Sequence, residues 1–409
     1  MSSTPPAPPP SSLDLPRQTA FFLRSTSILP QPYTSGDANM LSLAFFILAG
    51  LDLLGLLEEQ EGSHPPAAAA ADSAIESKQI SPAQKQGWIQ WIYSFQAPDP
   101  AGGFTGSRFW DLGDHGRLLW EQGWGRASLA NTFMGLLMLL MLGDDLGALR
   151  KAALADWVRG LQSQSGGFAE EVPAGIACIL GPRYECVDVA RLRAFVVNAQ
   201  EYEGGVGQSW AMEGHSGLNY CAIGCLTLLD RLDQAGKKLP SRGVASDHQR
   251  RMRRLGEHGF DVPECVDPKR QHHDGTSPHE YFGLPPFLPR EEALSLVAGF
   301  SGRTNKMADT CYGFWNLSAL DILGMSDLAN HPALRRYLLD KTQHRIGGFS
   351  KAPGEFPDLM HSYLGLAALA VMREEGLKPL DPALCVSRGV WTRIERFHGA
   401  VANAEERRR

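Results

Sequence analysis

Strongly apolar segments recur along the chain, and mostly polar stretches separate them. Four of these segments are as long as a helix and carry few polar residues; they span residues 127–142, 218–229, 310–323 and 361–372. A helix that is hydrophobic on nearly every side is buried on nearly every side. Residues 86–95 also fit a helix, with more polar positions. The pattern predicts an all-α protein in which buried helices alternate with amphipathic ones.

A glycine turn is repeated between these helices. Glycine pairs followed by Phe or Val stand at residues 102–104, 166–168, 204–206 and 347–349, and each pair follows a glutamine, namely Gln96, Gln164, Gln200 and Gln343. Glycine suits the positive φ of a sharp reversal, and the apolar residue after the pair can fill the core. Helical hairpins must bury their faces against neighbouring hairpins, so the array either stacks into an open solenoid or closes.

Two features of the apolar helices favour a closed barrel over an open solenoid that binds proteins. The inner helices are almost continuously apolar, and their polar, cationic and aromatic exceptions cluster at the N-terminal ends. Helix N-termini present unpaired backbone N–H groups and the positive end of the helix dipole, which suit a diphosphate. We therefore predict a closed barrel of helical hairpins with surface insertions.

Several segments fall outside the repeat. Residues 1–16 are rich in Pro and Ser and lack the basic and apolar regions of a signal peptide, so we expect a disordered tail. Residues 40–57 are the most apolar stretch, but polar and glycine positions interrupt them, which favours a buried core helix over a membrane span. Residues 62–81 and 233–290 are predicted insertions, and residues 401–409 a charged tail. One domain, residues 17–400, remains.

The composition narrows the possible functions. The chain has 409 residues and a formal net charge of −6, whereas general nucleic-acid binding usually needs a basic balance. Its seven cysteines lack a tight framework of spacings, which is typical of a reduced intracellular protein. We therefore expect a cytoplasmic protein with no nucleic-acid partner and no stable membrane anchor.

The candidate chemistry lies near residues 302–315 and 358–363. Asp309 and Cys311 precede one apolar helix, and His361 opens another. Carboxylate, thiolate and imidazole can together hold a catalytic zinc with one open position. Taken alone, a cysteine at a helix start is more often a small buried hydrophobe, and a remote histidine a core residue. Arg303 and Lys306 would lie on one turn, where two cations can hold a diphosphate.

The motif R-x-x-K-x-x-D-x-C-Y-x-F-W at residues 303–315, followed by His361, closely resembles the signature of protein prenyltransferase β subunits. The resemblance covers most of the chain apart from the tails and insertions. It implies the α-α toroid that this family shares with terpenoid cyclases, in which inner helices surround an apolar funnel for an isoprenoid. It also implies that Asp309, Cys311 and His361 bind one Zn²⁺ and that the protein substrate's cysteine thiolate takes the open position.

The resemblance assigns roles to residues around the metal as well. The side chains that would surround the diphosphate are those of His215, Arg303, Lys306 and Tyr312. From the sequence alone, His215 fits a helix cap better than a catalytic role. Trp315 would line the isoprenoid funnel, and Phe46 and Met360 would contact the C-terminal side chains of the acceptor peptide.

Two positions bear on the subclass, again by resemblance. Ser42 falls where geranylgeranyltransferases of type I have a small residue and farnesyltransferases a bulky Trp, so the pocket has room for a fourth isoprene unit. Lys351 falls where farnesyltransferases have an Asp that supports magnesium binding, and its ammonium group would replace that ion. These positions imply geranylgeranyl diphosphate as donor, no strict Mg²⁺ requirement, and acceptors with a C-terminal CaaX motif, such as Rho-type small GTPases.

Three alternatives stay open at this point. A farnesyltransferase β subunit differs only in pocket length and in the residue at position 351. A terpenoid cyclase shares the toroid, but the chain shows no Asp-rich protonating motif. A non-catalytic helical scaffold would bind no zinc. The resemblance also implies an obligate α subunit as partner.

One interval departs from the family pattern. Residues 176–197 contain Gly181-Pro182 and a charged segment, where the resemblance leads us to expect a full inner helix. A deletion in the protein and a truncated gene model would both explain this shortening.

Overall fold

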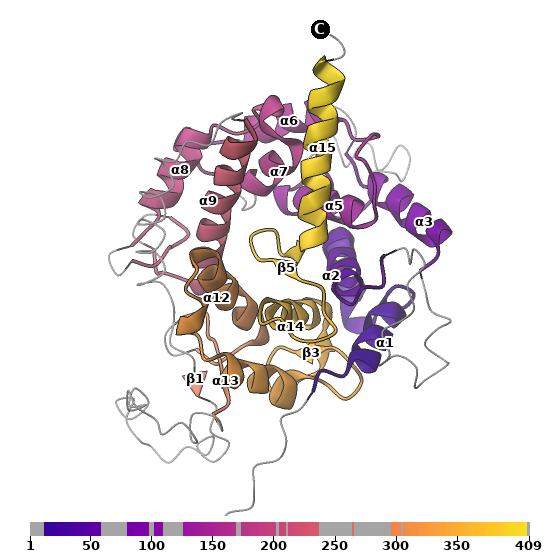
Figure 1. Ribbon diagram of the computed structural model, residues 1–409, viewed down its shortest axis with the longest axis vertical. Coiled ribbons are helices and arrows are strands. Elements are labelled where there is room, and N and C mark those ends of the chain that lie inside the picture. Colours follow the sequence, from indigo (N-terminus) through magenta and orange to yellow (C-terminus); the bar gives the residue numbers. More distant parts are fainter. Residues whose placement is uncertain are drawn as a thin grey trace, which may run out of the picture.

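The computed structural model describes residues 12–58, 80–97, 102–108, 126–168, 173–201, 204–209, 212–236, 264–265, 296–303 and 306–406. Within these residues, six helices follow one another around a ring (Figure 1). They are α2 (Met40–Leu53), α5 (Leu129–Met141), α7 (Pro173–Leu180), α9 (Ser216–Gly236), α12 (Thr310–Leu323) and α14 (Leu359–Val371). Each helix packs against the next, and α14 packs against α2, so the ring closes. The predicted all-α toroid is confirmed, and an open solenoid is excluded.

Amphipathic helices cover the outside of this ring (Figure 1). They are α1 (Leu15–Ser25) on α2, α3 (Pro82–Tyr93) on α5, α6 (Lys151–Leu161) on α7, and α8 (Val189–Asn198) on α9. The helix α13 (His331–Arg336) continues as a π-helical turn, Tyr337–Thr342, near α14. Burial of the apolar inner helices between neighbours and outer helices supplies the main stabilisation of the ring.

Short 3-10 segments and two-residue strands connect the helices. The 3-10 segments span Gln31–Asn39, Pro182–Tyr184 and Ser326–Leu328. Three antiparallel pairs join β1 (Glu264–Cys265) to β2 (Ala298–Gly299), β3 (Phe349–Ser350) to β4 (Pro357–Asp358), and β5 (Leu380–Asp381) to β6 (Val386–Ser387). These pairs hold individual loops and do not form a layer of their own.

The repeated glycine turn has the predicted conformation. Gly166 has φ of 94°, and a Cβ added there would lie 2.3 Å from a backbone oxygen, so only glycine fits. The side-chain amides of Gln96 and Gln200 donate to the carbonyl of the first glycine of their turns at 3.0 and 2.9 Å. In the second repeat this role belongs to Gln162, at 2.9 Å, and not to the predicted Gln164. Gln162 lies four residues before Gly166, the same spacing as that of Gln200 before Gly204.

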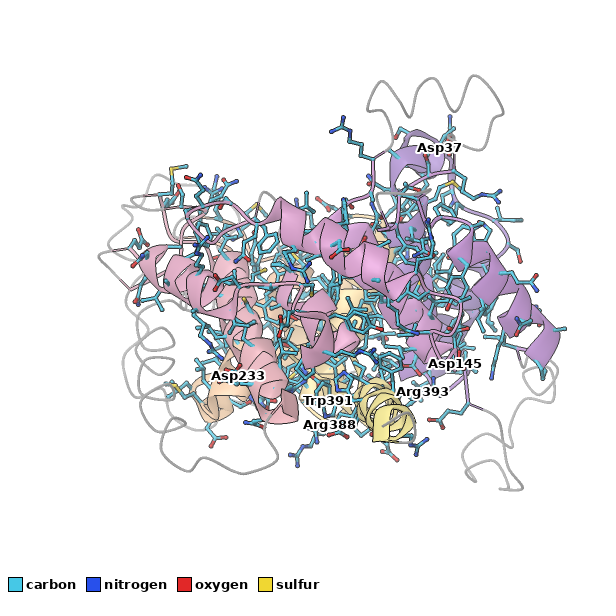
Figure 2. All side chains as sticks on the ribbon, turned by 90° about the horizontal axis from the view of Figure 1, so that it is seen from above. Asp37, Asp145, Asp233, Arg388, Trp391 and Arg393 are labelled. Carbon is cyan, nitrogen blue, oxygen red and sulfur yellow. The ribbon has the colours of Figure 1, made fainter. Side chains whose placement is uncertain are left out.

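The inner helices start at one end of the ring and finish at the other (Figure 2). In that view Asp37, which precedes α2, lies opposite Asp145 and Asp233, which stand at the C-terminal ends of α5 and α9. The helix α15 (Arg388–Glu406) crosses this second end. Its Arg393 donates to the carbonyls of Met141, at 2.7 Å, and Leu140, which end α5. Arg393 thereby pairs with carbonyl oxygens that have no partner within the helix because the helix ends there.

Some segment boundaries differ from the prediction. Ordered structure begins before residue 17, because the Asp14 side chain caps α1 and the Gln343 side chain donates to the Ser12 carbonyl. The helix α9 continues to Gly236, inside the predicted insertion 233–290, and α15 continues to Glu406, inside the predicted charged tail. Residues 1–11, 62–79, 407–409 and most of 233–290 lie outside the described residues.

The apolar stretch near the N-terminus forms a wall of the ring. Residues Gln31–Leu53 are long and apolar enough to cross a membrane by length and composition, but half of the apolar window is buried inside the protein. The helix α2 within it contacts α1, α5 and α14. These contacts favour the predicted core helix.

Candidate metal centre

Asp309, Cys311 and His361 meet where α12 and α14 begin. Asp309 is the N-cap of α12, and its Oδ1 accepts the Cys311 backbone N–H at 2.9 Å. His361 lies in the first turn of α14, the neighbouring helix. One donor atom from each of the three residues lies within 4.8 Å of the others, and all three residues are buried. The fold therefore brings together the three side chains that the sequence singled out.

The donor set fits a metal ion. His361 Nε2 lies 3.2 Å from Asp309 Oδ1, but the geometry is not that of a hydrogen bond, and this buried nitrogen has no hydrogen-bond partner within the described residues. Buried polar atoms are normally paired, so an unpaired nitrogen beside a carboxylate and a thiol is what a cation site leaves. An oxygen, a nitrogen and a sulfur ligand suit zinc with a fourth position open.

The pKa shifts of the three side chains also favour binding of a cation. Burial and the neighbouring Asp309 carboxylate raise the pKa of the Cys311 thiol far above its usual range. Burial alone would lower the pKa of His361, but the Asp309 and Asp358 carboxylates outweigh it and raise the pKa to about 9. Burial alone would raise the pKa of Asp309, but contacts with His361 and Cys311 lower it. A divalent cation would reverse the effect on the thiol and the imidazole, because it stabilises their deprotonated forms.

Asp358 orients the histidine, and the sequence analysis gave it no role. Its Oδ2 lies 2.6 Å from His361 Nδ1, and its Oδ1 accepts the His361 backbone N–H at 2.9 Å as the N-cap of α14. Metal-binding histidines usually donate their second nitrogen to such a carboxylate. The signal was present in the sequence as an Asp three residues before a His at the start of an apolar helix.

His215 and Tyr312 face each other at the starts of α9 and α12. The Tyr312 hydroxyl lies 2.9 Å from His215 Nε2, and His215 Nδ1 accepts the Gly217 backbone N–H at 3.1 Å. In the neutral ring, Nε2 therefore carries the proton and donates to the tyrosine oxygen. His215 therefore has the capping role that the sequence suggested, and it also contacts Tyr312.

Three cations lie close to this end of the ring. The Arg303 guanidinium pairs with the Glu213 carboxylate at 2.9 Å, a partner that the sequence did not suggest. Lys306 is exposed, and its backbone N–H donates to the Arg303 carbonyl at 3.2 Å. Lys351 Nζ lies 4.0 Å from Asp309 Oδ2. The predicted anion site and the metal cluster thus occupy the same end of the ring.

The predicted lipid and peptide residues come from three neighbouring inner helices. The Trp315 ring on α12 lies 5.0 Å from the Tyr312 ring. Phe46 on α2 lies 6.1 Å from the Tyr363 ring on α14, where Met360 is half-buried. Ser42 Oγ donates to Asn131 Oδ1 at 3.1 Å, which links α2 to α5.

A closed ring of paired helices, with an Asp, Cys and His cluster where two inner helices begin, is the arrangement of a toroidal prenyltransferase. The chain belongs to the family described as the prenyltransferase alpha-alpha toroid domain, whose sequence profile matches residues 13–386. Together with the β subunits that the chain matches, this profile confirms the resemblance to protein prenyltransferase β subunits.

Comparison with individual relatives bears on the subclass of prenyltransferase. The chain is 29% identical to geranylgeranyl transferase type-1 subunit beta of Arabidopsis thaliana, over 92% of this chain and 89% of the relative. It is 28% identical to the same subunit of Dictyostelium discoideum, over 90% and 93%. A farnesyltransferase subunit beta of Schizosaccharomyces pombe matches at 22% identity, over 88% and 79%.

A solved structure shares the fold. It is Candida albicans protein geranylgeranyltransferase-I complexed with GGPP, with a TM-score of 0.68 and 21% identity over 95% of this chain and 99% of the other. At this identity the likeness supports the toroid fold, while the family assignment comes from the sequence profile.

Proposed function

We propose that this chain is the catalytic β subunit of a zinc-dependent protein geranylgeranyltransferase of type I. It would transfer a geranylgeranyl group from the diphosphate to the cysteine of a C-terminal CaaX motif and form a thioether. The observation that carries this proposal is the buried Asp309, Cys311 and His361 cluster, with its unpaired imidazole nitrogen, beside cationic side chains. The type-1 β subunits of Arabidopsis and Dictyostelium support the subclass.

The cluster would prepare the acceptor. Asp309, Cys311 and His361 would hold zinc, which when bound lowers the pKa of a ligated thiol and so supplies a thiolate at neutral pH. Asp358 fixes the imidazole through its 2.6 Å contact with Nδ1. The acceptor sulfur then forms a bond to C1 of the allylic diphosphate, and the bond from C1 to the diphosphate oxygen breaks.

The surrounding side chains would stabilise the leaving group. Negative charge grows on the diphosphate as the C1–O bond breaks, so prearranged donors lower the barrier. Arg303, Lys306, His215 and Tyr312 are the donors proposed for it. Lys351 lies within 4.0 Å of Asp309 and would supply the positive charge that a magnesium ion supplies elsewhere. Mg²⁺ is therefore not required in this proposal.

The lipid and the acceptor would occupy the ring between α2, α12 and α14. Trp315 would line the lipid path, and Phe46 and Met360 would contact the last residues of the acceptor peptide. Ser42, a small residue, would leave space for the fourth isoprene unit. The acceptors would be cytoplasmic CaaX proteins ending in Leu or Phe, such as Rho-type small GTPases, and an α subunit would complete the enzyme.

A donor comparison tests the proposal. The chain is co-expressed with an α subunit, bound zinc is counted, and transfer from geranylgeranyl and farnesyl diphosphate to a peptide ending in Cys-aliphatic-aliphatic-Leu is measured. We expect about one zinc per heterodimer and preference for the longer donor. In the Ser42→Trp variant we expect preference for farnesyl diphosphate. Farnesyl preference in the wild type would refute the subclass, and transfer without bound zinc would refute the metal site.

A further inference from the structure

The segment that carries Arg303 is fixed against the start of α9. The Ser216 backbone N–H donates to the Gly302 carbonyl at 3.1 Å, and the Ser216 hydroxyl donates to the Ser301 carbonyl at 3.3 Å. The Ser301 hydroxyl in turn donates to the Arg303 carbonyl at 3.1 Å. Both serines are buried, and hydrogen bonds away from water are electrostatically stronger. The backbone of Arg303 is therefore fixed relative to α9.

The backbone beside Glu213 is held by a separate set of contacts. The Gly214 N–H donates to Glu201 Oε1 at 2.9 Å, and the His215 N–H donates to the Val206 carbonyl at 3.1 Å. A Cβ added to Gly214 would lie 2.1 Å from the same Glu201 oxygen, so the approach is close. Glu213 therefore extends from a backbone that is held in place just before α9 begins.

The ion pair between Arg303 and Glu213 is exposed and joins one atom of each group. Arg303 Nη1 lies 2.9 Å from Glu213 Oε2, and the two side chains are 41% and 68% exposed. A guanidinium and a carboxylate bind each other best through two parallel hydrogen bonds, and this pair has one. Exposed ion pairs contribute little free energy and are screened by salt. An anion with more charge can therefore displace Glu213 from the guanidinium.

The pair lies among the side chains proposed to bind the diphosphate. His215 follows Glu213 by two residues, and its Nε2 lies 2.9 Å from the Tyr312 hydroxyl. The Lys306 backbone N–H donates to the Arg303 carbonyl at 3.2 Å. Glu213 thus brings a negative charge to a group of donors that would hold an anion. A carboxylate at this place opposes the binding of a second anion, because it occupies a donor of Arg303 and because like charges repel.

We propose that Glu213 is the exchangeable counterion of Arg303. In the empty enzyme Glu213 pairs with the guanidinium, and the diphosphate of the donor displaces it. After transfer, Glu213 competes with the released diphosphate for the same guanidinium and so favours its departure. Glu213 acts through Arg303 and is a positioning residue. This inference rests on the proposed function, because it takes Arg303 to bind the diphosphate.

The direction of the change in Glu213→Gln distinguishes a counterion from a structural support. If Glu213 served to hold Arg303 in place, the substitution would weaken diphosphate binding, whereas removal of a competing charge strengthens it. Inorganic diphosphate is titrated into the heterodimer by calorimetry, and its inhibition of lipid transfer is measured separately. We expect its affinity to rise about 2- to 5-fold, the range that an exposed ion pair accounts for. Its inhibition constant should fall by a similar factor.

Three further variants are matched controls for Glu213→Gln. Glu213→Asp keeps the charge, so its affinity for diphosphate should stay within about twofold of the wild type. Glu58→Gln makes the same change of net charge beyond the C-terminal end of α2, where Glu58 is 61% exposed and pairs with Lys378 at 2.9 Å. It should leave the affinity unchanged. In the Arg303→Gln background, Glu213→Gln should have no further effect, because the two side chains act as a pair.

The outcomes that overturn the counterion differ from those that overturn the proposed function. Weaker or unchanged diphosphate binding in Glu213→Gln would overturn the counterion. An equal gain in Glu58→Gln, or in the Arg303→Gln background, would do the same, because the effect would then not pass through Arg303. The proposed function fails separately, if the wild-type heterodimer transfers neither lipid.

Discussion

Replacing Asp358 by Asn removes the charge that orients His361, a proposed zinc ligand, and keeps the helix cap. In the wild type, Asp358 Oδ2 lies 2.6 Å from His361 Nδ1, and Oδ1 accepts the His361 backbone N–H at 2.9 Å. Asn and Asp cap helices about equally well, so the Asn variant retains the second contact. The substitution therefore isolates the action of the carboxylate on the imidazole.

The expected effect is a loss of metal affinity without a comparable loss of fold. Removing a partner that orients a metal-binding histidine typically lowers metal affinity about 10- to 100-fold, which is about 1.4 to 2.7 kcal/mol. Asp358→Ala also removes the cap, so its free energy of unfolding should be about 1 kcal/mol lower than that of the Asn variant. Transfer activity at limiting zinc should fall in parallel with affinity.

Zinc affinity is measured by competition with a chelator, and stability by denaturant unfolding of the same preparations. Asp188→Asn is a matched control, because Asp188 caps α8 in the same way and accepts the Arg191 backbone N–H at 3.0 Å away from the metal centre. It should leave zinc affinity unchanged. Wild-type zinc affinity in Asp358→Asn would refute the role of the carboxylate. If the free energy of unfolding of Asp358→Asn were as low as that of Asp358→Ala, the loss of zinc affinity would be due to a destabilised fold.

Three further outcomes follow from the same end of the ring. Lys351→Ala removes the ammonium group 4.0 Å from Asp309, so transfer at low donor concentration should become dependent on Mg²⁺; an unchanged rate without Mg²⁺ would count against the replacement of the ion. Gly302→Ala places a Cβ 2.1 Å from the Tyr312 ring, so affinity for the isoprenoid diphosphate should fall about 10-fold with bound zinc unchanged. A wild-type affinity for the diphosphate would show that Tyr312 does not touch it. Zinc binding at pH 7 should release about two protons, from Cys311, whose pKa is raised, and from His361, whose pKa is about 9. Affinity should therefore rise as pH rises, and calorimetry in buffers of different ionisation enthalpy would show the protons.

The ring was predictable because each inner helix is apolar on nearly all sides. Such helices cannot face water, and the glycine turns between them repeat at the same place in each hairpin. The three proposed metal ligands followed from the family motif, and not from their spacing. The motif could not predict the partner of each residue. The contact between Asp358 and His361 depends on side-chain direction, and the pair of Glu213 and Arg303 joins residues far apart in the chain.

Register within the repeats was harder to predict than the repeats themselves. Gln164 and Gln162 both precede the second glycine pair, and only Gln162 has the four-residue spacing of Gln200 and Gly204. Spacing alone does not decide the contact, because Gln96 makes the equivalent bond from six residues before Gly102. Gln162 also accepts the Asp188 backbone N–H at 2.7 Å, a contact between neighbouring hairpins that no local pattern reveals.

The interval that departs from the family pattern still contributes to the closed ring. Within the described residues α7 spans Pro173–Leu180, and it ends at Gly181, whose φ of 87° stops the helix. All of its residues are buried, and it still contacts α5 and α9 on either side, so the ring does not open there. His398 of α15 lies with Nε2 3.2 Å from the carbonyl of Ile179 and so satisfies an acceptor at the end of the short helix. The helix α15 therefore pairs with carbonyls at the ends of both α5 and α7, at the end of the ring opposite the Asp309, Cys311 and His361 cluster.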